Sequence, residues 1–139
     1  MVKTSKNTKQ TYIFAVGRRR SAIARVRLYE GKGENVVNKK PAANYFPGSV
    51  QAVLWNRPFA ATKTEDKYYV TVKVEGGGKE GQLDAVVHGI SRALAQADPD
   101  NFKNVLRKQG LLTRDPRIRE RRKVGMGGKA RRKKQSPKR

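Results

Sequence analysis

The stretch that decides the fold is residues 67–97, which read KYYVTVKVEGGGKEGQLDAVVHGISRALAQA. Its first part alternates along residues 67–75, with one set of side chains predicted to point inward: Tyr68, Val70, Val72 and Val74. This alternation is typical of a half-buried strand. After Gly76-Gly77-Gly78, apolar residues recur at helical spacing and predict a helix with one buried face: Leu83, Val86, Val87, Ile90, Leu94 and Ala97.

Two more strands are predicted before this stretch. Residues 12–17 form a short apolar run that ends in glycine, as a buried strand does. Residues 22–29 alternate and predict a second half-buried strand, whose outer face carries Ile23, Arg25, Arg27 and Tyr29. After a turn at Gly31 and Gly33, residues 34–38 favour a returning hairpin strand, which Lys39-Lys40-Pro41 ends.

Three further helical segments are expected. Residues 42–46 favour a short helical turn, and Ser49 is placed to N-cap a helix that ends before Pro58. That helix has one apolar face, formed by Val50, Val53 and Leu54. Asp98 is the expected N-cap of the last helix, with Pro99 at its first position and Gly110 just beyond its end. Its buried face is expected to hold Phe102, Val105 and Leu106.

This order of elements predicts an α+β, or mixed α/β, two-layer sheet-and-helix domain with its helices on one sheet face. The predicted domain organisation is a flexible basic arm at residues 1–10, a globular α+β body at residues 11–113, and a long, basic, unstructured C-terminal tail at residues 114–139. Leu111 and Leu112 are the last apolar anchor before the tail.

The charge of the chain points to a polyanionic partner. The net charge is +22, and the tail, with thirteen Lys or Arg and two acids, supplies half of it. Because the tail has no aromatic residue and few apolar ones, we expect it to be disordered until a polyanion orders it. The body is as basic as the tail, so we expect anionic surface on more than one side of it.

Several classes of protein are excluded or disfavoured by composition. Without cysteine there can be no disulfide or thiolate metal site, and a single histidine cannot form a His-cluster site. No apolar run approaches the roughly 18 residues of a membrane span, and the N-terminus lacks the apolar core of a signal peptide. We therefore expect no cofactor, no metal and no membrane partner, and a cytoplasmic location.

Residues 76–81 formally fit the G-x-G-x-x-G phosphate-binding pattern. A dinucleotide site would need another parallel strand after the helix, and the sequence predicts none. Two interpretations stay open. One is a sharp strand-to-helix turn, and the other is a set of backbone amides that bind an RNA phosphate with help from Lys79.

Two other candidate sites have simpler explanations. His88 lies between the apolar stripe and the polar face of its helix, so it is interpreted as a helix-flank residue or an RNA contact rather than a catalytic base. Tyr68 and Tyr69 resemble the stacking aromatics of an RNA-recognition sheet, but they lie on opposite faces and the expected motif is missing. Core packing explains this pair better.

The cations of the body and the tail are the predicted RNA-binding residues. Tail cations have almost no acids nearby to pair with, and Arg suits structured RNA because its planar fork binds phosphate bidentately and stacks on bases. In the body these residues are Arg18, Arg19, Arg20, Arg25, Arg27, Lys39, Lys40 and Lys79. In the tail they are Arg114, Arg117, Arg119, Arg121, Arg122, Lys123, Lys129, Arg131, Arg132, Lys133 and Lys134.

Five ordered motifs resemble one family, the ninth protein of the small ribosomal subunit in its bacterial form. They are Gly17-Arg-Arg-Arg-Ser-Ala-Ile-Ala-Arg-Val26, Gly76-Gly-Gly-Lys-Glu-Gly-Gln82, His88-Gly-Ile-Ser-Arg-Ala-Leu94, Gly110-Leu-Leu-Thr-Arg-Asp-Pro-Arg117, and Glu120-Arg-Arg-Lys-Val-Gly125 leading to Lys129-Ala-Arg-Arg132.

The resemblance implies a ribosomal-protein-five second-domain-like fold, seated on ribosomal RNA in the head of the small subunit beside neighbouring small-subunit proteins. It also implies a tail that reaches the peptidyl-site transfer RNA (tRNA) through Lys138 and Arg139. This chain departs from the family pattern at Ser136 and Pro137, and at residues 83–87, where Gly and Arg are usual and Asp84 now stands.

Three functions therefore compete. The first is a non-catalytic ribosomal protein, and the second is a general nucleic-acid-compacting protein without ribosomal specificity. The third is an enzyme built around residues 76–81 and His88. The five motifs and the division of charge between body and tail favour the first.

Overall fold

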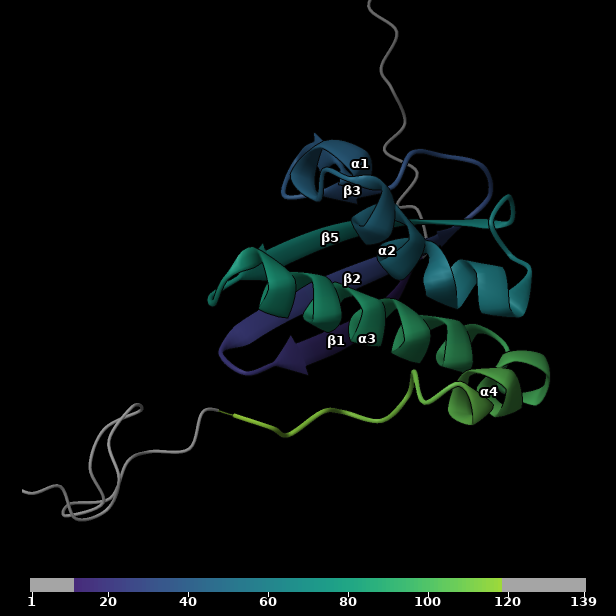
Figure 1. Ribbon diagram of the computed structural model, residues 1–139. Coiled ribbons are helices and arrows are strands. Elements are labelled where there is room, and N and C mark those ends of the chain that lie inside the picture. Colours follow the sequence, from purple (N-terminus) through teal and green to yellow (C-terminus); the bar gives the residue numbers. More distant parts are fainter. Residues whose placement is uncertain (1–11, 119–139) are drawn as a thin grey trace, which may run out of the picture.

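A five-stranded mixed sheet forms one layer of the protein, and helices cover one of its faces (Figure 1). The computed structural model describes residues 12–118. The strands lie in the order β1-β2-β5-β3-β4. Along the chain, the elements are β1 (Tyr12–Arg19), β2 (Ala22–Glu30), β3 (Val36–Val37), β4 (Lys40–Pro41), α1 (Ala42–Tyr45), α2 (Ser49–Thr62), β5 (Tyr68–Glu75), α3 (Lys79–Ala97) and α4 (Pro99–Lys108).

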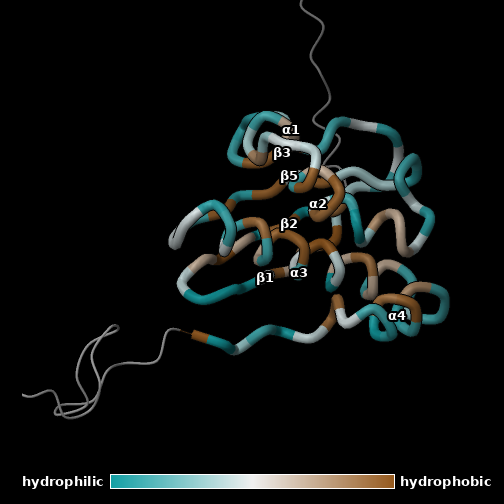
Figure 2. The backbone as a smooth tube through the Cα atoms, viewed as in Figure 1, coloured by the Kyte–Doolittle hydropathy of each residue, from teal (hydrophilic) through white to brown (hydrophobic). Residues whose placement is uncertain are grey.

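Strands β1, β2 and β5 pair antiparallel and form the larger part of the sheet, with β1 at its edge. The predicted alternation is confirmed: four residues of β2 and three of β5 are buried on the helix side, namely Ala22, Ala24, Val26, Leu28, Val70, Val72 and Val74. Strand β1 is longer than predicted because it continues through Arg18 and Arg19 before the turn at Arg20. Figure 2 shows hydrophobic segments in these strands and in the helix that covers them.

The third strand is not the hairpin partner of β2 that the sequence suggested. β3 crosses to the far side of β5 and pairs with it in parallel, and Lys40-Pro41 forms β4 instead of ending the pairing. Asn38 and Lys39 have φ of 49° and 66°, as a tight two-residue hairpin turn requires. The Asn38 carboxamide extends the short strand because its Oδ1 accepts from Val74 N at 2.8 Å and its Nδ2 donates to Val74 O at 2.9 Å.

Helix α3 packs directly on β1 and β2, and glycine makes this close approach possible. A Cβ built on Gly17 of β1 would lie 1.9 Å from Ala85 O of α3, and one on Gly89 would lie 2.6 Å from the Val26 side chain. Four residues of the predicted stripe are buried in this helix, namely Leu83, Val86, Ile90 and Leu94, whereas Val87 and Ala97 are only partly buried. The helix begins at Lys79, four residues before Leu83. The sheet and α3 therefore share one core.

Helix α2 differs most from its prediction. It runs through Pro58 to Thr62, and its N-cap is Gly48 rather than Ser49. Its predicted apolar face points to solvent, with Val50 65% and Val53 70% exposed, whereas Pro58 and Phe59 are buried. Proline inside a helix costs about 3 kcal/mol, and burial of Pro58 and Phe59 acts against this cost.

Helix α4 and the segment after it follow the prediction closely. Asp98 caps α4 and accepts a hydrogen bond from Asn101 N at 3.3 Å, and Gly110 has φ of 72° just beyond the helix. Leu111 is buried and Leu112 packs against the core. From there the chain runs back beside α3 toward the end of β1 (Figure 1).

The predicted α+β class is confirmed for residues 12–118. The predicted basic arm at residues 1–10 and most of the predicted tail, residues 119–139, lie outside the described residues. Within residues 12–118, no helix is both long enough and apolar enough to cross a bilayer. The same part of the chain contains no group of three or more potential metal-ligating side chains.

Candidate nucleic-acid interface

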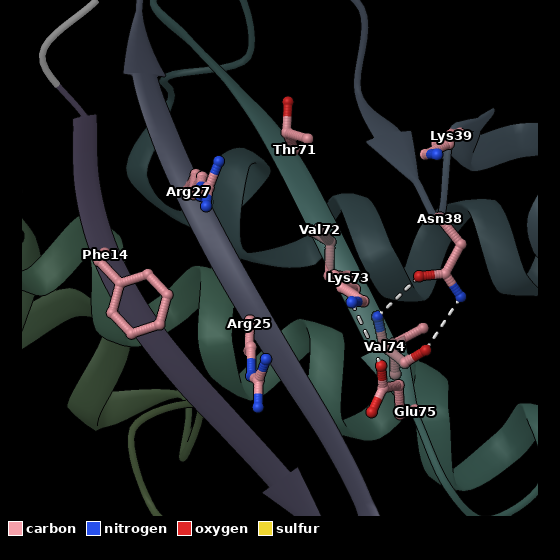
Figure 3. Close-up of a pocket in the computed structure, with 10 residues that line it drawn as sticks. All are labelled: Phe14, Arg25, Arg27, Asn38, Lys39, Thr71, Val72, Lys73, Val74 and Glu75. Atoms are coloured by element: carbon pink, nitrogen blue, oxygen red, sulfur yellow. Dashed lines mark hydrogen bonds and ion pairs between the residues drawn. The ribbon is translucent and has the colours of Figure 1, made fainter.

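The sheet face opposite α3 carries no helix in the described part of the chain (Figure 3). The strand register arranges its outward side chains in rows across β1, β2 and β5. The first row is aromatic and consists of Tyr12, Tyr29 and Tyr69. The ring centroids of Tyr12 and Tyr29 are 5.6 Å apart. Those of Tyr29 and Tyr69 are 5.2 Å apart, and these two rings are nearly parallel. Tyr69 thus belongs to an aromatic surface, which the sequence did not predict.

The next two rows carry the cations. One consists of Phe14, Arg27 and Thr71, and the other of Val16, Arg25 and Lys73. Arg25 and Arg27 are exposed, and the Arg27 guanidinium lies 5.1 Å from the centroid of the Tyr12 ring. Such a contact lets a cation rest on an aromatic face while its remaining N–H groups stay available for an anion.

A shallow depression of about 600 Å³ lies across these rows (Figure 3). Lys39 and Asn38 border it on the β3 side, and Phe14 borders it on the β1 side. Glu75 is the acid in its lining, and its carboxylate lies 3.5 Å from the Lys73 ammonium. The depression therefore presents a surplus of positive charge to any ligand.

Arg19 lies on the opposite face from Arg25 and Arg27, although the sequence grouped them. Its side chain is largely buried, and its Nη1 donates to Arg117 O at 2.6 Å. It also pairs with Asp84 at 3.6 Å and with Asp115 at 3.2 Å. The alternation of β1 places Arg18 outward and Arg19 inward, so Arg19 anchors the chain rather than joining the outer face.

The other predicted body cations lie at the turns and edges of the sheet. Arg20 is exposed in the β1–β2 turn with φ of 55°, and Lys40 is exposed in β4. The Lys79 ammonium lies 3.3 Å from the centroid of the Tyr45 ring and donates to Tyr45 O at 3.3 Å. Lys79 is thus held beside α1 rather than on the outer face with Arg25.

The glycine-rich loop is a sharp strand-to-helix turn. Gly76 and Gly77 have φ of 80° and 62°, and a Cβ on Gly76 would lie 2.4 Å from Ser21 O. In the described part of the chain no strand follows α3, so a dinucleotide-binding unit is incomplete here.

His88 is a half-buried residue on the flank of α3. Its Nε2 lies 3.2 Å from Leu112 O, so it tethers the segment that leads away from α4. Burial, assisted by the charges of Arg92 and Arg114, lowers the pKa of His88 below its ordinary value. A neutral imidazole that donates from Nε2 fits this position.

Residues 114–118 extend along the body without helix or strand. Here Arg117 forms a forked contact with Asp115, with its Nε 2.9 Å from Oδ1 and its Nη2 2.6 Å from Oδ2. These hydrogen bonds hold the pKa of the Asp115 carboxyl well below its ordinary value. The first predicted tail residues are thus anchored at Arg19. The predicted contacts from Arg119 onward, including Lys138 and Arg139, lie outside the described residues.

Sequence reasoning missed three cations that the fold gives a defined place. Lys73 lies on the outer face, and its position in the alternation of β5 was the available signal. Arg57 of α2 borders a second depression, which Arg18 and Arg117 also line. Arg92 donates from Nη1 to Val16 O at 2.6 Å, a long-range contact with no local signal.

The family model described as Ribosomal protein S9/S16 matches residues 17–139. The chain belongs to this family. It is 52% identical over 126 residues to "Small ribosomal subunit protein uS9" of Rickettsia rickettsii (strain Sheila Smith), covering 91% of this chain and 78% of that protein. It is 48% identical over 115 residues to the protein of the same name from Maridesulfovibrio salexigens, covering 83% of this chain and 88% of that protein.

Membership in the Ribosomal protein S9/S16 family identifies the chain as a structural ribosomal protein of the small subunit rather than an enzyme. The prediction of a non-catalytic role in translation is confirmed, and the location is the ribosome. Ribosomal RNA and other ribosomal proteins are the partners that this role implies.

Proposed function

We propose that the chain binds ribosomal RNA of the small-subunit head with two separate surfaces, one on the body and one on the tail. The single observation that carries the body surface is the row pattern of the outer sheet face, which directs Arg25 and Arg27 to the same side. Arg18 of β1 and Lys39 beside the depression extend this surface toward its edges. Its charge complements phosphate, the dominant source of protein–RNA affinity. Lys40 lies opposite the buried Val37, so its predicted RNA contact is made from the other face of the sheet.

Arg20 and Lys79, which lie away from the outer sheet face, are also proposed to contact phosphates of the ribosomal RNA. Arg19 contributes indirectly because its guanidinium anchors the backbone of Arg117 at the end of β1. The fold is inferred to be ribosomal-protein-five second-domain-like, on the strength of the α+β body and the family membership.

The tail is proposed to follow head RNA and to place Lys138 and Arg139 at the peptidyl-site tRNA. Residues 119–139 contain eleven Lys or Arg and one acid, so the tail is a dense polycation. Pro137 fixes φ and removes a backbone donor, so contact near the end is expected from the side chains of Lys138 and Arg139.

The salt dependence of RNA binding tests this division. The intact chain and a chain lacking residues 119–139 are titrated with small-subunit head RNA at several salt concentrations. If about ten tail cations neutralise phosphates, deletion should reduce the log–log slope by about 7–9. An unchanged slope would contradict a tail contact. A chain that washes off assembled subunits in high salt would contradict a ribosome-specific role.

The transfer-RNA contact needs a separate test. Lys138→Ala with Arg139→Ala should leave subunit assembly intact and weaken binding of tRNA at the peptidyl site of purified subunits. Equal tRNA affinity in the variant and the parent would reject this part of the proposal. Lys133→Ala with Lys134→Ala is the control, because it removes the same charge away from the end.

A further inference from the structure

One aromatic side chain on the outer face is exposed between two cations. Phe14 is 48% exposed and lies opposite Arg27 in the strand register, while Arg25 lies opposite the next outward position, Val16. Figure 3 shows the Phe14 ring nearly face-on, with the two guanidiniums on the neighbouring strand. Tyr29 contacts both Tyr12 and Tyr69, whereas Phe14 contacts no other ring in residues 12–118.

This combination selects for a particular kind of ligand. A large apolar ring left exposed beside cations is stabilised by a partner that offers both a flat apolar surface and negative charge. An unpaired nucleotide offers both, because its base stacks on aromatic side chains and its phosphate binds Arg. Because Phe14 and the two arginines lie on adjacent strands of one face, a base on the ring can have its flanking phosphates beside the guanidiniums.

Two other ligands, an RNA duplex and a protein segment, would each match only one of the two features of this surface. A duplex would meet the cations of Arg25 and Arg27 with its phosphates, but its bases are already stacked and would leave Phe14 uncovered. A protein segment would cover Phe14, but it would need several acids to match Arg25, Arg27 and Lys39. Glu75 of this chain does not neutralise these cations, because its carboxylate already lies beside the Lys73 ammonium.

We propose that the helix-free sheet face binds an unpaired segment of ribosomal RNA, with one base stacked on Phe14 and the flanking phosphates on Arg25 and Arg27. This inference rests on the proposed function and names the form of RNA that the body surface recognises. It makes Phe14 a binding residue that neither charge nor family motif identifies.

The test compares two RNA probes of equal phosphate number at one salt concentration. One is a single strand that carries 2-aminopurine, a fluorescent base analogue, and the other is a hairpin duplex. Phe14→Ala in the full chain should weaken single-strand binding about 5-fold or more and leave duplex binding unchanged. Phe14→Trp should restore single-strand binding and quench the 2-aminopurine fluorescence. Val53→Ala, which removes exposed apolar surface on α2, is the matched control.

Circular dichroism confirms that each variant is folded. Equal single-strand affinity in the Phe14→Ala variant and the parent would overturn the inference, as would an equal loss on both probes that Phe14→Trp fails to restore. If either result is found while the RNA affinity of the intact chain still depends on salt as proposed, only the stacking site is wrong. If the intact chain shows no salt-dependent RNA binding, the proposed function itself fails.

Crosslinking in the assembled subunit supplies an independent measurement. The chain carrying p-azidophenylalanine in place of Phe14 is incorporated into small subunits and irradiated. A crosslink to an unpaired nucleotide of ribosomal RNA supports the proposal. A crosslink to protein alone would overturn it and would identify this face as a protein contact.

Discussion

The Nη1 atom of Arg19 donates a hydrogen bond to the carbonyl oxygen of Arg117 at 2.6 Å, across 98 residues of sequence. This contact joins the end of β1 to the segment that leads into the basic tail. It anchors Arg117 through a largely buried side chain, which the sequence alone would assign to RNA. The first prediction tests this anchor.

Replacing Arg19 by Gln should lower the free energy of unfolding by about 1–3 kcal/mol, because the carbonyl oxygens and carboxylates that it contacts lose a charged donor. Asp84 and Asp115 are partly exposed, so the cost is smaller than for a fully buried pair. Urea denaturation measures the change, and faster proteolysis near residue 117 should accompany it. Arg25→Gln on the outer face is the control and should change stability by less than about 0.5 kcal/mol.

Adding a methyl group at Gly89 should be strongly destabilising. The new Cβ would lie 2.6 Å from the Val26 side chain and 3.1 Å from Gly17 N, so α3 would have to move away from the sheet. We expect Gly89→Ala to cost about 1–3 kcal/mol or more, as overpacking does. Gly81→Ala in the same helix meets its neighbours at 3.8 Å and should stabilise by about 0.5–1 kcal/mol. Equal midpoints of chemical denaturation for the two variants would contradict this account of the interface.

The stability of the body should depend on pH through His88. The pKa of His88 is lowered in the folded state, so between that pKa and its ordinary value of 6.5 the unfolded chain binds more protons. The stabilisation is therefore fully present above pH 6.5 and is lost as the pH falls through the folded pKa. Urea denaturation from pH 7.5 to pH 5 should show this fall, and His88→Gln should flatten it.

The carboxyl of Asp115 acts in a separate and more acidic window. Its folded pKa lies below the ordinary value of 3.8, so its contribution is present above that value and declines only at lower pH. A fall in stability between pH 7.5 and pH 5 that persists in His88→Gln would show that other groups are responsible.

The exposed face of α2 should tolerate polar substitution. Val53→Ser is expected to change the free energy of unfolding by less than about 0.5 kcal/mol, because Val53 is 70% exposed. Phe59→Ala on the opposite side should cost about 3–5 kcal/mol, because that ring is 1% exposed. A large loss of stability in Val53→Ser would contradict the exposure of Val53 and support the buried face that the sequence predicted.

How much of the fold is readable from sequence depends on the range of each interaction. The alternation of β2 and β5, the stripe of α3 and the Asp98 cap are local patterns, and each was predicted with the correct element. The hairpin predicted for residues 34–38 was wrong because the Asn38 carboxamide pairs with Val74, which is 36 residues away. The predicted buried face of helix α2 was wrong because Val50, Val53 and Leu54 have the spacing of such a face, yet within residues 12–118 Val50 and Val53 are largely exposed and Leu54 is only partly covered.

The candidate site shows the same difference between local patterns and long-range contacts. The sequence by itself determined that the chain is basic throughout, that the outer face of β2 carries Arg25 and Arg27, and that its motifs belong to one ribosomal family. These properties depend on residue identity and on a period of two or 3.6, which need no knowledge of distant partners.

Only the tertiary structure decided which side chains meet. The register of β1, β2 and β5 aligned three tyrosines and placed Phe14 beside Arg27, and the pleat of β1 turned Arg19 inward to hold Arg117. A shift of one residue in strand pairing would exchange the two faces without changing any local pattern. The choice between those registers comes from packing Ala22, Ala24 and Val26 against α3, an interaction between segments far apart in the chain.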